Sequence, residues 1–253
     1  MFYNSKGLSI YYETFGNGEN SIIILPGWGN TRNTFYNIIN YFKDNYKIYI
    51  FDYPGFGKSP VPDNDLTIYD YANIIAHFIK TQNISNPIVI AHSFGGRITS
   101  ILCAIHNINF KKIILIDVAG IKRRKKIKVI IREKIYKLLK KITYFFPKDK
   151  RLLFQKKLLL HFASPDYNDI PLCMKKTFKN IISEDLSKYY KEIISDTLIL
   201  WGNKDYDTPL KDGIFLEKNI KNSALIKFRN ASHFSYLYNP YLINKIIDIF
   251  ISN

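Results

Sequence analysis

Short apolar runs alternate along the chain with segments of helical periodicity. The runs predict strands near residues 8–15, 21–26, 46–52, 87–92, 112–118, 196–201 and 223–228, and the 3.6-residue pattern predicts helices near 32–44, 67–82, 94–107, 209–219 and 239–251. This alternation favours right-handed crossovers and a mostly parallel sheet with helices on both faces. In residues 8–15 apolar and polar positions alternate, which predicts an edge strand in an antiparallel pair.

The alternation breaks between residues 119 and 195. This stretch is too long for a crossover loop and holds no convincing strand, so we expect a helical insertion there between core segments 1–118 and 196–253. Residues 122–157 hold sixteen Lys or Arg and two acids, and this excess supplies +14 of the net charge of +16. Apolar side chains recur within the stretch at helical spacing, at Ile127, Ile130, Ile131, Ile135, Leu138, Leu139 and Ile142.

The basic amphipathic segment has two interpretations. Its apolar stripe packs on the body of the protein and its charges are simply solvated, or the segment binds an anionic partner. An anionic lipid surface, an acyl group carried by an acidic carrier protein and an acidic small substrate all fit the second interpretation. The sequence does not decide between them.

Composition limits the class of protein. The chain has 253 residues, 47% of them hydrophobic, which suits one α/β domain with an insertion. The first residues lack the basic start and apolar block of a signal peptide, and no apolar run approaches the roughly eighteen residues that span a bilayer. Cys103 and Cys173 have no metal-ligand or redox spacing, which suits a cytoplasmic protein. We expect no metal, no cofactor and no nucleic-acid partner; the oligomeric state is left open.

A serine follows the predicted strand 87–92 in a setting typical of a nucleophile. The segment AHSFGG at residues 91–96 places Ser93 between an apolar strand and a helix, with Ala91 and Gly95 two positions before and after it. A nucleophile elbow requires small residues there, because the strand and helix backbones nearly touch. Ala91 stands where Gly is usual, and its methyl group is the smallest possible addition.

Two later predicted strands are also followed by candidates for catalysis. Asp205 and Asp207 follow strand 196–201, and His233 follows strand 223–228. Because the carboxyl ends of parallel strands share one edge of a sheet, these side chains are expected to meet Ser93. Asp205 is the preferred acid, since Asp207 lies close to a proline and better fits a turn or helix start. His92 is expected to have a structural role.

In the order Ser, Asp, His, the chain resembles the α/β-hydrolase superfamily over nearly its whole length. The resemblance implies a mostly parallel sheet covered by helices, an inserted lid over residues 119–195, and a catalytic triad of Ser93, Asp205 and His233. It also implies an oxyanion hole formed by the backbone N–H groups of Trp28 and Phe94. The turn PGWG at residues 26–29 has Pro where the superfamily usually has His.

The resemblance implies a serine hydrolase that cleaves carboxylic esters, or thioesters, of small or medium acyl groups. An esterase for acyl groups on a carrier protein, a carbon–carbon bond hydrolase or lyase, and a non-catalytic ligand receptor or membrane-surface protein are the alternatives. Turnover of simple p-nitrophenyl esters separates the enzymes from the receptor. Aromatic residues beside the motifs are expected to contact the substrate: Phe35, Phe56 and Phe234.

Overall fold

The computed structural model describes residues 1–122, 127–162 and 170–253. The chain divides into two compact units, one formed by Met1–Lys122 with Thr177–Asn253 and the other by Arg123–Lys176. The second unit is shorter than the insertion predicted at 119–195, because residues 119–122 and 177–195 belong to the first unit. Among the helices of the described ranges, none combines the length and the hydrophobicity that a membrane span requires.

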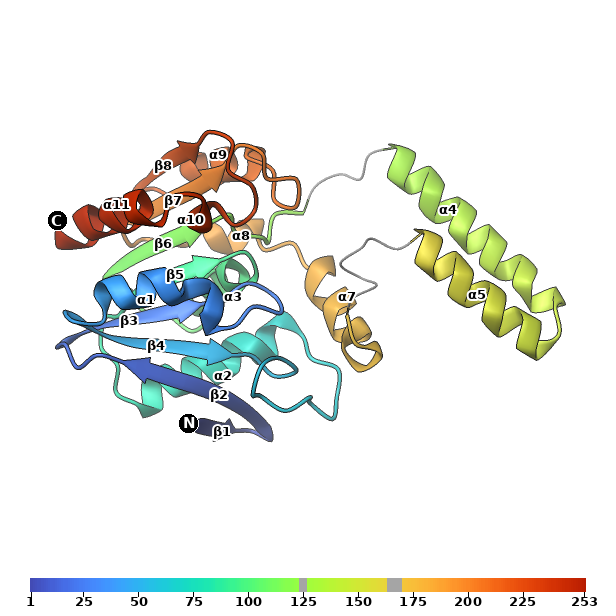
Figure 1. Ribbon diagram of the computed structural model, residues 1–253, viewed down its shortest axis with the longest axis horizontal. Helices are drawn as coiled ribbons and strands as arrows, with labels where there is room; N and C mark the ends of the chain where they lie inside the picture. Colours follow the sequence, from blue (N-terminus) through green and yellow to red (C-terminus); the bar gives the residue numbers. More distant parts are fainter. Residues whose placement is uncertain (123–126, 163–169) are drawn as a thin grey trace. The chain divides into compact units, whose positions relative to one another are not determined.

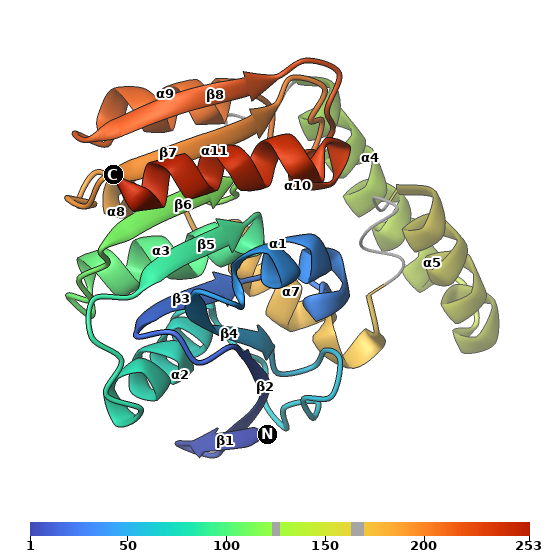
Figure 2. The same ribbon diagram turned by 60° about the vertical axis from the view of Figure 1, so that its left-hand side comes forward.

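The first unit is built on one eight-stranded sheet (Figures 1 and 2). Its strands lie in the order β1-β2-β4-β3-β5-β6-β7-β8; β1 and β2 are antiparallel to their neighbours and the other strands are parallel. The mostly parallel α/β sheet predicted from the sequence is therefore confirmed. The strand bounds are Phe2–Ser5, Leu8–Phe15, Asn20–Leu25, Tyr46–Asp52, Ile88–His92, Lys112–Ile116, Thr197–Gly202 and Ser223–Phe228 for β1 to β8.

The prediction that residues 8–15 form an edge strand was wrong. The strand is antiparallel, as expected, but β1 pairs outside it with Tyr3 opposite Ile10. With only four residues, β1 is too short for its alternation to register as a strand in the sequence.

Buried strands have two apolar faces because helices cover both sides of the sheet. In β3, Ile22 and Ile24 enter the core under α1 (Tyr36–Phe42) and α11 (Pro240–Ser252). Ile23 and Leu25 enter the opposite core, under α2 (Ile68–Thr81), α3 (Phe94–Ala104) and α9 (Lys211–Asn219). Continuous apolar runs are thus the expected signature of these parallel strands. The remaining helices of this unit are α8 (Ser187–Tyr190), α10 (Ser235–Tyr238), the 3-10 turn η1 (Arg32–Phe35) and most of α7 (Lys175–Ser183).

The regular structure in the described part of the second unit is helical. It contains α4 (Ile127–Ile142), η2 (Thr143–Phe145), α5 (Lys148–Phe162) and η3 (Leu172–Met174). The predicted basic run at residues 123–126 and the side chains of Ile127 and Ile130 lie outside what the structure describes. Of the predicted apolar stripe, Ile131, Ile135 and Leu138 are exposed to solvent.

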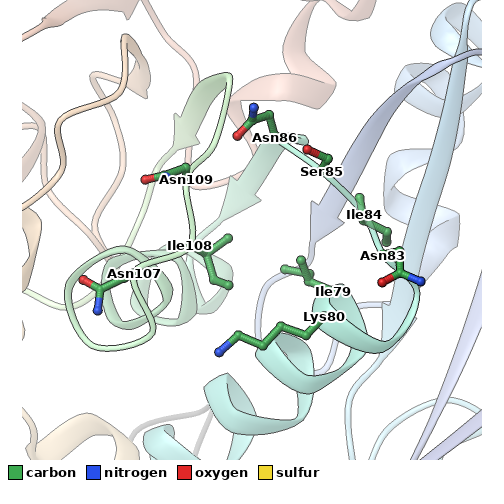
Figure 3. Close-up of a pocket in the computed structure, with 9 residues that line it drawn as sticks. All are labelled: Ile79, Lys80, Asn83, Ile84, Ser85, Asn86, Asn107, Ile108 and Asn109. Carbon is green, nitrogen blue, oxygen red and sulfur yellow. The ribbon is translucent and has the colours of Figure 1, made fainter.

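A surface recess lies at the amino ends of β5 and β6 (Figure 3). Ser93 follows the carboxyl end of β5, so the recess and the predicted catalytic residues are at opposite edges of the sheet. It is lined by Ile79, Lys80, Asn83, Ile84, Ser85, Asn86, Asn107, Ile108 and Asn109.

Candidate active site

Ser93 occupies the turn between β5 and α3 in a backbone conformation that is costly for a residue with a side chain. Its φ is +47° and its ψ is −108°, outside the regions that L-residues favour. The N–H of Ser93 donates to the carbonyl of Ile116 at 3.1 Å, and the carbonyl of Ser93 accepts from Gly96 at 3.1 Å and Ala119 at 3.0 Å. These bonds to β6, to α3 and to the segment after β6 hold the strained turn in place.

The glycines after Ser93 are required by close contacts with a neighbouring backbone and a neighbouring side chain. A Cβ atom at Gly95 would lie 2.0 Å from the carbonyl oxygen of Leu25, and one at Gly96 would lie 2.3 Å from the Cβ of Val118. Ala91 is fully buried in the core beneath α2 and α3, so its methyl group fits where the superfamily usually has Gly. The elbow therefore tolerates Ala two positions before the serine but no side chain two or three positions after it.

The predicted triad residues meet at the carboxyl edge of the sheet. His233 Nε2 lies 2.9 Å from Ser93 Oγ, and His233 Nδ1 lies 2.8 Å from Asp205 Oδ2. Since an ionised carboxylate only accepts hydrogen bonds, Nδ1 carries the proton and donates to Asp205. Nε2 is then free to accept the hydroxyl proton of Ser93.

Asp205 is a buried carboxylate held by its own loop. Its Oδ1 accepts from the backbone N–H groups of Asp207 and Thr208 at 2.8 and 2.9 Å, and Thr208 Oγ1 lies 2.7 Å from its Oδ2. Asp207 thus contributes its backbone, while its side chain is exposed. The geometry favours Asp205 over Asp207 as the partner of the imidazole.

The charges of Asp205 and His233 stabilise each other. Burial alone would raise the pKa of Asp205, but hydrogen bonds from His233 and Thr208 outweigh burial and lower it. Burial alone would lower the pKa of His233, but the hydrogen bond and charge of Asp205 raise it. Asp205, Asp207 and His233 also offer ligand atoms within 4.8 Å of one another. Hydrogen-bond donors already surround the Asp205 oxygens, however, so this group does not fit a cation.

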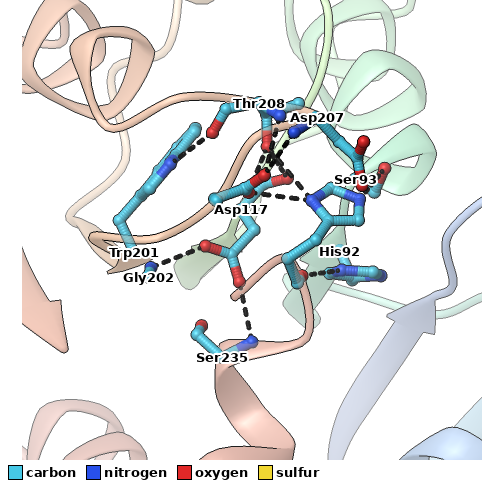
Figure 4. Close-up of polar contacts among 10 residues, drawn as sticks. His92, Ser93, Asp117, Trp201, Gly202, Asp207, Thr208 and Ser235 are labelled. Carbon is cyan, nitrogen blue, oxygen red and sulfur yellow. Dashed lines mark hydrogen bonds and ion pairs between the residues drawn. The ribbon is translucent and has the colours of Figure 1, made fainter. Parts of the chain in front are cut away.

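Asp117 is a buried acid that the sequence interpretation missed. It follows β6, and its carboxylate accepts the backbone N–H of Gly202 at 2.8 Å and that of Ser235 at 3.0 Å (Figure 4). Gly202 begins the turn that carries Asp205, and Ser235 lies two residues after His233. Burial raises the pKa of Asp117 to about 7, against the effect of these hydrogen bonds. One side chain therefore fixes both loops. Asp117 falls within the strand predicted at residues 112–118, whereas β6 ends at Ile116, so the sequence prediction did not mark it as a residue that follows a strand.

Trp28 and Phe94, the predicted oxyanion donors, lie against each other. Their ring centroids are 5.3 Å apart, with the rings edge to face. Phe94 is the first residue of α3, where a helix has no internal acceptor for its N–H. Both amides are left without an acceptor in the part of the chain that the structure describes, and their role as oxyanion donors stays a prediction.

The predicted substrate contacts divide into two groups. Phe56 packs edge-on against Trp28 at 4.7 Å between centroids, and Phe234 is 37% exposed beside the ring of His233. Phe35 instead lies fully buried in the core under α1 and α11, stacked on Tyr236 at 4.8 Å. The structure thus places Phe35 in the core, where its ring contacts Tyr236 of α10 and His92 of β5.

Phe178, on α7, also contacts Trp28, as Phe56 and Phe94 do. Its ring centroid lies 5.4 Å from that of Trp28. The sequence interpretation missed it because residue 178 falls within the predicted insertion, where no strand fixes the position of a side chain.

Comparison with known proteins identifies the family. The profile of the alpha/beta hydrolase fold family matches residues 20–165, and the chain belongs to this family. The predicted resemblance is confirmed, and the protein is a hydrolase.

Relatives and solved structures agree on this fold. The chain is 26% identical to the pimeloyl-[acyl-carrier protein] methyl ester esterase of Wigglesworthia glossinidia brevipalpis, over 95% of this chain and 97% of that protein. It is 25% identical to the 2-hydroxy-6-oxo-6-phenylhexa-2,4-dienoate hydrolase of Burkholderia cepacia, over 99% and 94%. The structure of an esterase from Exiguobacterium antarcticum superposes with a TM-score of 0.77 at 22% identity, covering 100% of this chain and 99% of that one.

Proposed function

We propose that this hydrolase cleaves carboxylic esters of small or medium acyl groups, or thioesters, through a serine acyl-enzyme. The observation that carries the proposal is the hydrogen-bonded chain from Ser93 Oγ through His233 to Asp205, at 2.9 and 2.8 Å. A nucleophile, a base and an acid that orients the base are the parts of this reaction.

The first half of the reaction forms the acyl-enzyme. His233 Nε2 accepts the proton of Ser93 as Oγ bonds to the carbonyl carbon, and the carbonyl electron pair moves to its oxygen. The amides of Trp28 and Phe94 donate to that oxyanion; losing one such donor typically costs about 3–4 kcal/mol of transition-state stabilisation. His233 then gives its proton to the leaving alcohol or thiol as the bond from the carbonyl carbon to the leaving group breaks.

The second half releases the acid. His233 removes a proton from water, whose oxygen attacks the acyl carbon, and the tetrahedral intermediate collapses by breaking the bond to Ser93 Oγ, which regains its proton. Asp205 remains ionised throughout and stabilises the imidazolium. Phe56 and Phe234 are proposed to contact the acyl group beside the triad.

A panel of p-nitrophenyl esters of graded acyl length tests the proposal. We expect turnover with a preference for one range of chain lengths, and loss of more than about a thousandfold of kcat in Ser93→Ala. Equal turnover by wild type and Ser93→Ala would overturn it, whereas binding without turnover would favour a ligand receptor.

A carrier-linked ester is the second candidate substrate. The relative from Wigglesworthia, similar over 95% of this chain, favours it, and the +14 of residues 122–157 would complement an acidic carrier protein. In this account the second unit, Arg123–Lys176, acts as the lid of the site. This candidate is tested by comparing kcat/KM for a methyl ester on acyl carrier protein with kcat/KM for the free methyl ester. Equal values would mean that the enzyme does not recognise the carrier protein.

Carbon–carbon bond hydrolysis is a further alternative, because the chain is similar to the dienoate hydrolase of Burkholderia cepacia. Assay of a 2-hydroxy-6-oxo dienoate beside the ester panel separates the two activities. Higher kcat/KM for the dienoate would reassign the substrate class without changing the proposed triad.

A further inference from the structure

The second unit contains a helical hairpin whose turn is fixed by local bonds. Helices α4 and α5 pack side by side and antiparallel, with η2 between them (Figure 1). Thr143 at the turn is buried; its hydroxyl donates to the Lys140 carbonyl at 2.6 Å and accepts from the Gln155 amide at 2.8 Å. The N–H of Phe146 donates to the Thr143 carbonyl at 3.1 Å. The backbone conformation of the turn is therefore determined within the hairpin itself.

Three consecutive aromatic residues project from this turn. Tyr144, Phe145 and Phe146 are 62%, 89% and 38% exposed. Phe146 packs partly on Phe154, with centroids 5.5 Å apart. Single exposed apolar side chains are common on protein surfaces, but three adjacent exposed rings on an ordered turn indicate a contact surface.

Cations flank the rings on both helices. Lys140 and Lys141 end α4, and Lys148, Lys150 and Arg151 begin α5, with Asp149 as the single acid in residues 140–151. The Arg151 guanidinium lies 5.3 Å from the centroid of the Tyr144 ring. Cations in the first turn of a helix oppose its macrodipole, so helix stability does not explain those of α5.

We propose that this turn, residues 140–151, docks on an anionic phospholipid surface. In an anionic bilayer a layer of negative headgroups lies directly above an apolar region. The cations of the turn would contact the headgroups while the adjacent rings enter the apolar region just below. An acidic protein surface would satisfy the cations but leave the most exposed ring, Phe145, without an apolar contact. The docking goes beyond the proposed ester hydrolysis and requires none of its catalytic residues.

Co-sedimentation with vesicles tests the docking, with full-length Ser93→Ala used so that binding is measured apart from turnover. We expect binding to vesicles of phosphatidylcholine with phosphatidylglycerol, little binding to phosphatidylcholine alone, and a decline with salt. A Phe145→Ala change in this background should weaken binding at least about tenfold, because the apolar ring that enters the bilayer is lost. The matched control is Tyr241→Ala, which removes a ring that is 71% exposed on α11, and it should bind normally.

Charge variants and a fluorescent probe complete the design. Lys140→Gln with Lys141→Gln should weaken binding and reduce its salt dependence, whereas Lys218→Gln with Lys221→Gln on the first unit should not. The emission of Phe145→Trp should shift to shorter wavelength with anionic vesicles. No binding by the wild type at low salt, an unshifted probe, or equal binding by Phe145→Ala would overturn the proposal. Binding of acyl carrier protein in place of vesicles would also overturn it and assign the cations to a protein.

Discussion

His92 Nε2 lies 2.8 Å from the backbone carbonyl oxygen of His233. Because a carbonyl only accepts, Nε2 carries the proton and donates it. Burial lowers the pKa of His92 to about 3, so the ring is neutral. His92, the residue before the nucleophile, thus holds the loop that carries the base. The distance between Ser93 and His233 therefore depends on this hydrogen bond.

Replacement of His92 by Ala should impair catalysis and stability together. The carbonyl of His233 would lose a buried donor, which costs about 1–3 kcal/mol of unfolding free energy. Displacement of the base should lower kcat by roughly 10- to 100-fold. Ester kinetics and urea unfolding measure the two effects. Partial recovery in His92→Gln, which keeps an N–H donor, would separate loss of the hydrogen bond from loss of packing.

Neutralising the two carboxyl groups of the acid loop should have unequal effects. Asp205→Asn should lower kcat by about 10⁴-fold, because an amide favours the wrong imidazole tautomer. Asp207→Asn should leave kcat within a few-fold of wild type, since its side chain is exposed and its backbone N–H remains. Steady-state kinetics of both variants on one ester decide the assignment. Similar losses would mean that the carboxylates share the role.

The pH dependence of kcat/KM should show one acid limb that reports His233. The reaction needs the neutral imidazole, and Asp205 raises the pKa of His233 above that of free histidine. Activity should therefore be lost as the pH falls through this raised pKa. In Asp205→Asn the residual activity should show the limb at lower pH, because the charge that stabilised the imidazolium is gone. A limb that does not move would contradict the pairing.

Asp117 should make stability depend on pH. Its pKa is raised to about 7 in the folded chain, from about 3.9 when unfolded. The stability that it contributes is present below about pH 4 and is lost as the pH rises to about 7, by at most about 4 kcal/mol. Urea unfolding at pH 5 and pH 8 should show wild type losing stability relative to Asp117→Asn. A difference between the two proteins that is independent of pH would mean that the carboxyl is already ionised at pH 5.

Much of the core could be predicted because parallel strands covered on both faces read as continuous apolar runs. The run at Ile22 to Leu25 supplies alternate residues to two cores, and its signal is local. The four residues of β1 are too few to predict a strand from their pattern. Helix ends shifted by one to a few residues, as for the helix predicted at 94–107, which ends at Ala104.

The candidate site divides in the same way. Ser93, Asp205 and His233 were predicted because each follows a strand, and the sheet brings those strand ends to one edge. Asp117 follows a strand as well, but only the structure shows which backbone groups it binds. The burial of Phe35 and the contact of Phe178 with Trp28 depend on helix packing, which no local pattern specifies.

The most direct test of the account is the site of covalent modification by an organophosphonate, read by mass spectrometry of the intact protein and of its peptides. We expect one adduct per chain, on Ser93, and far slower labelling in His233→Ala, because Ser93 then lacks its base. An adduct on another residue, or labelling at the same rate in His233→Ala, would contradict it.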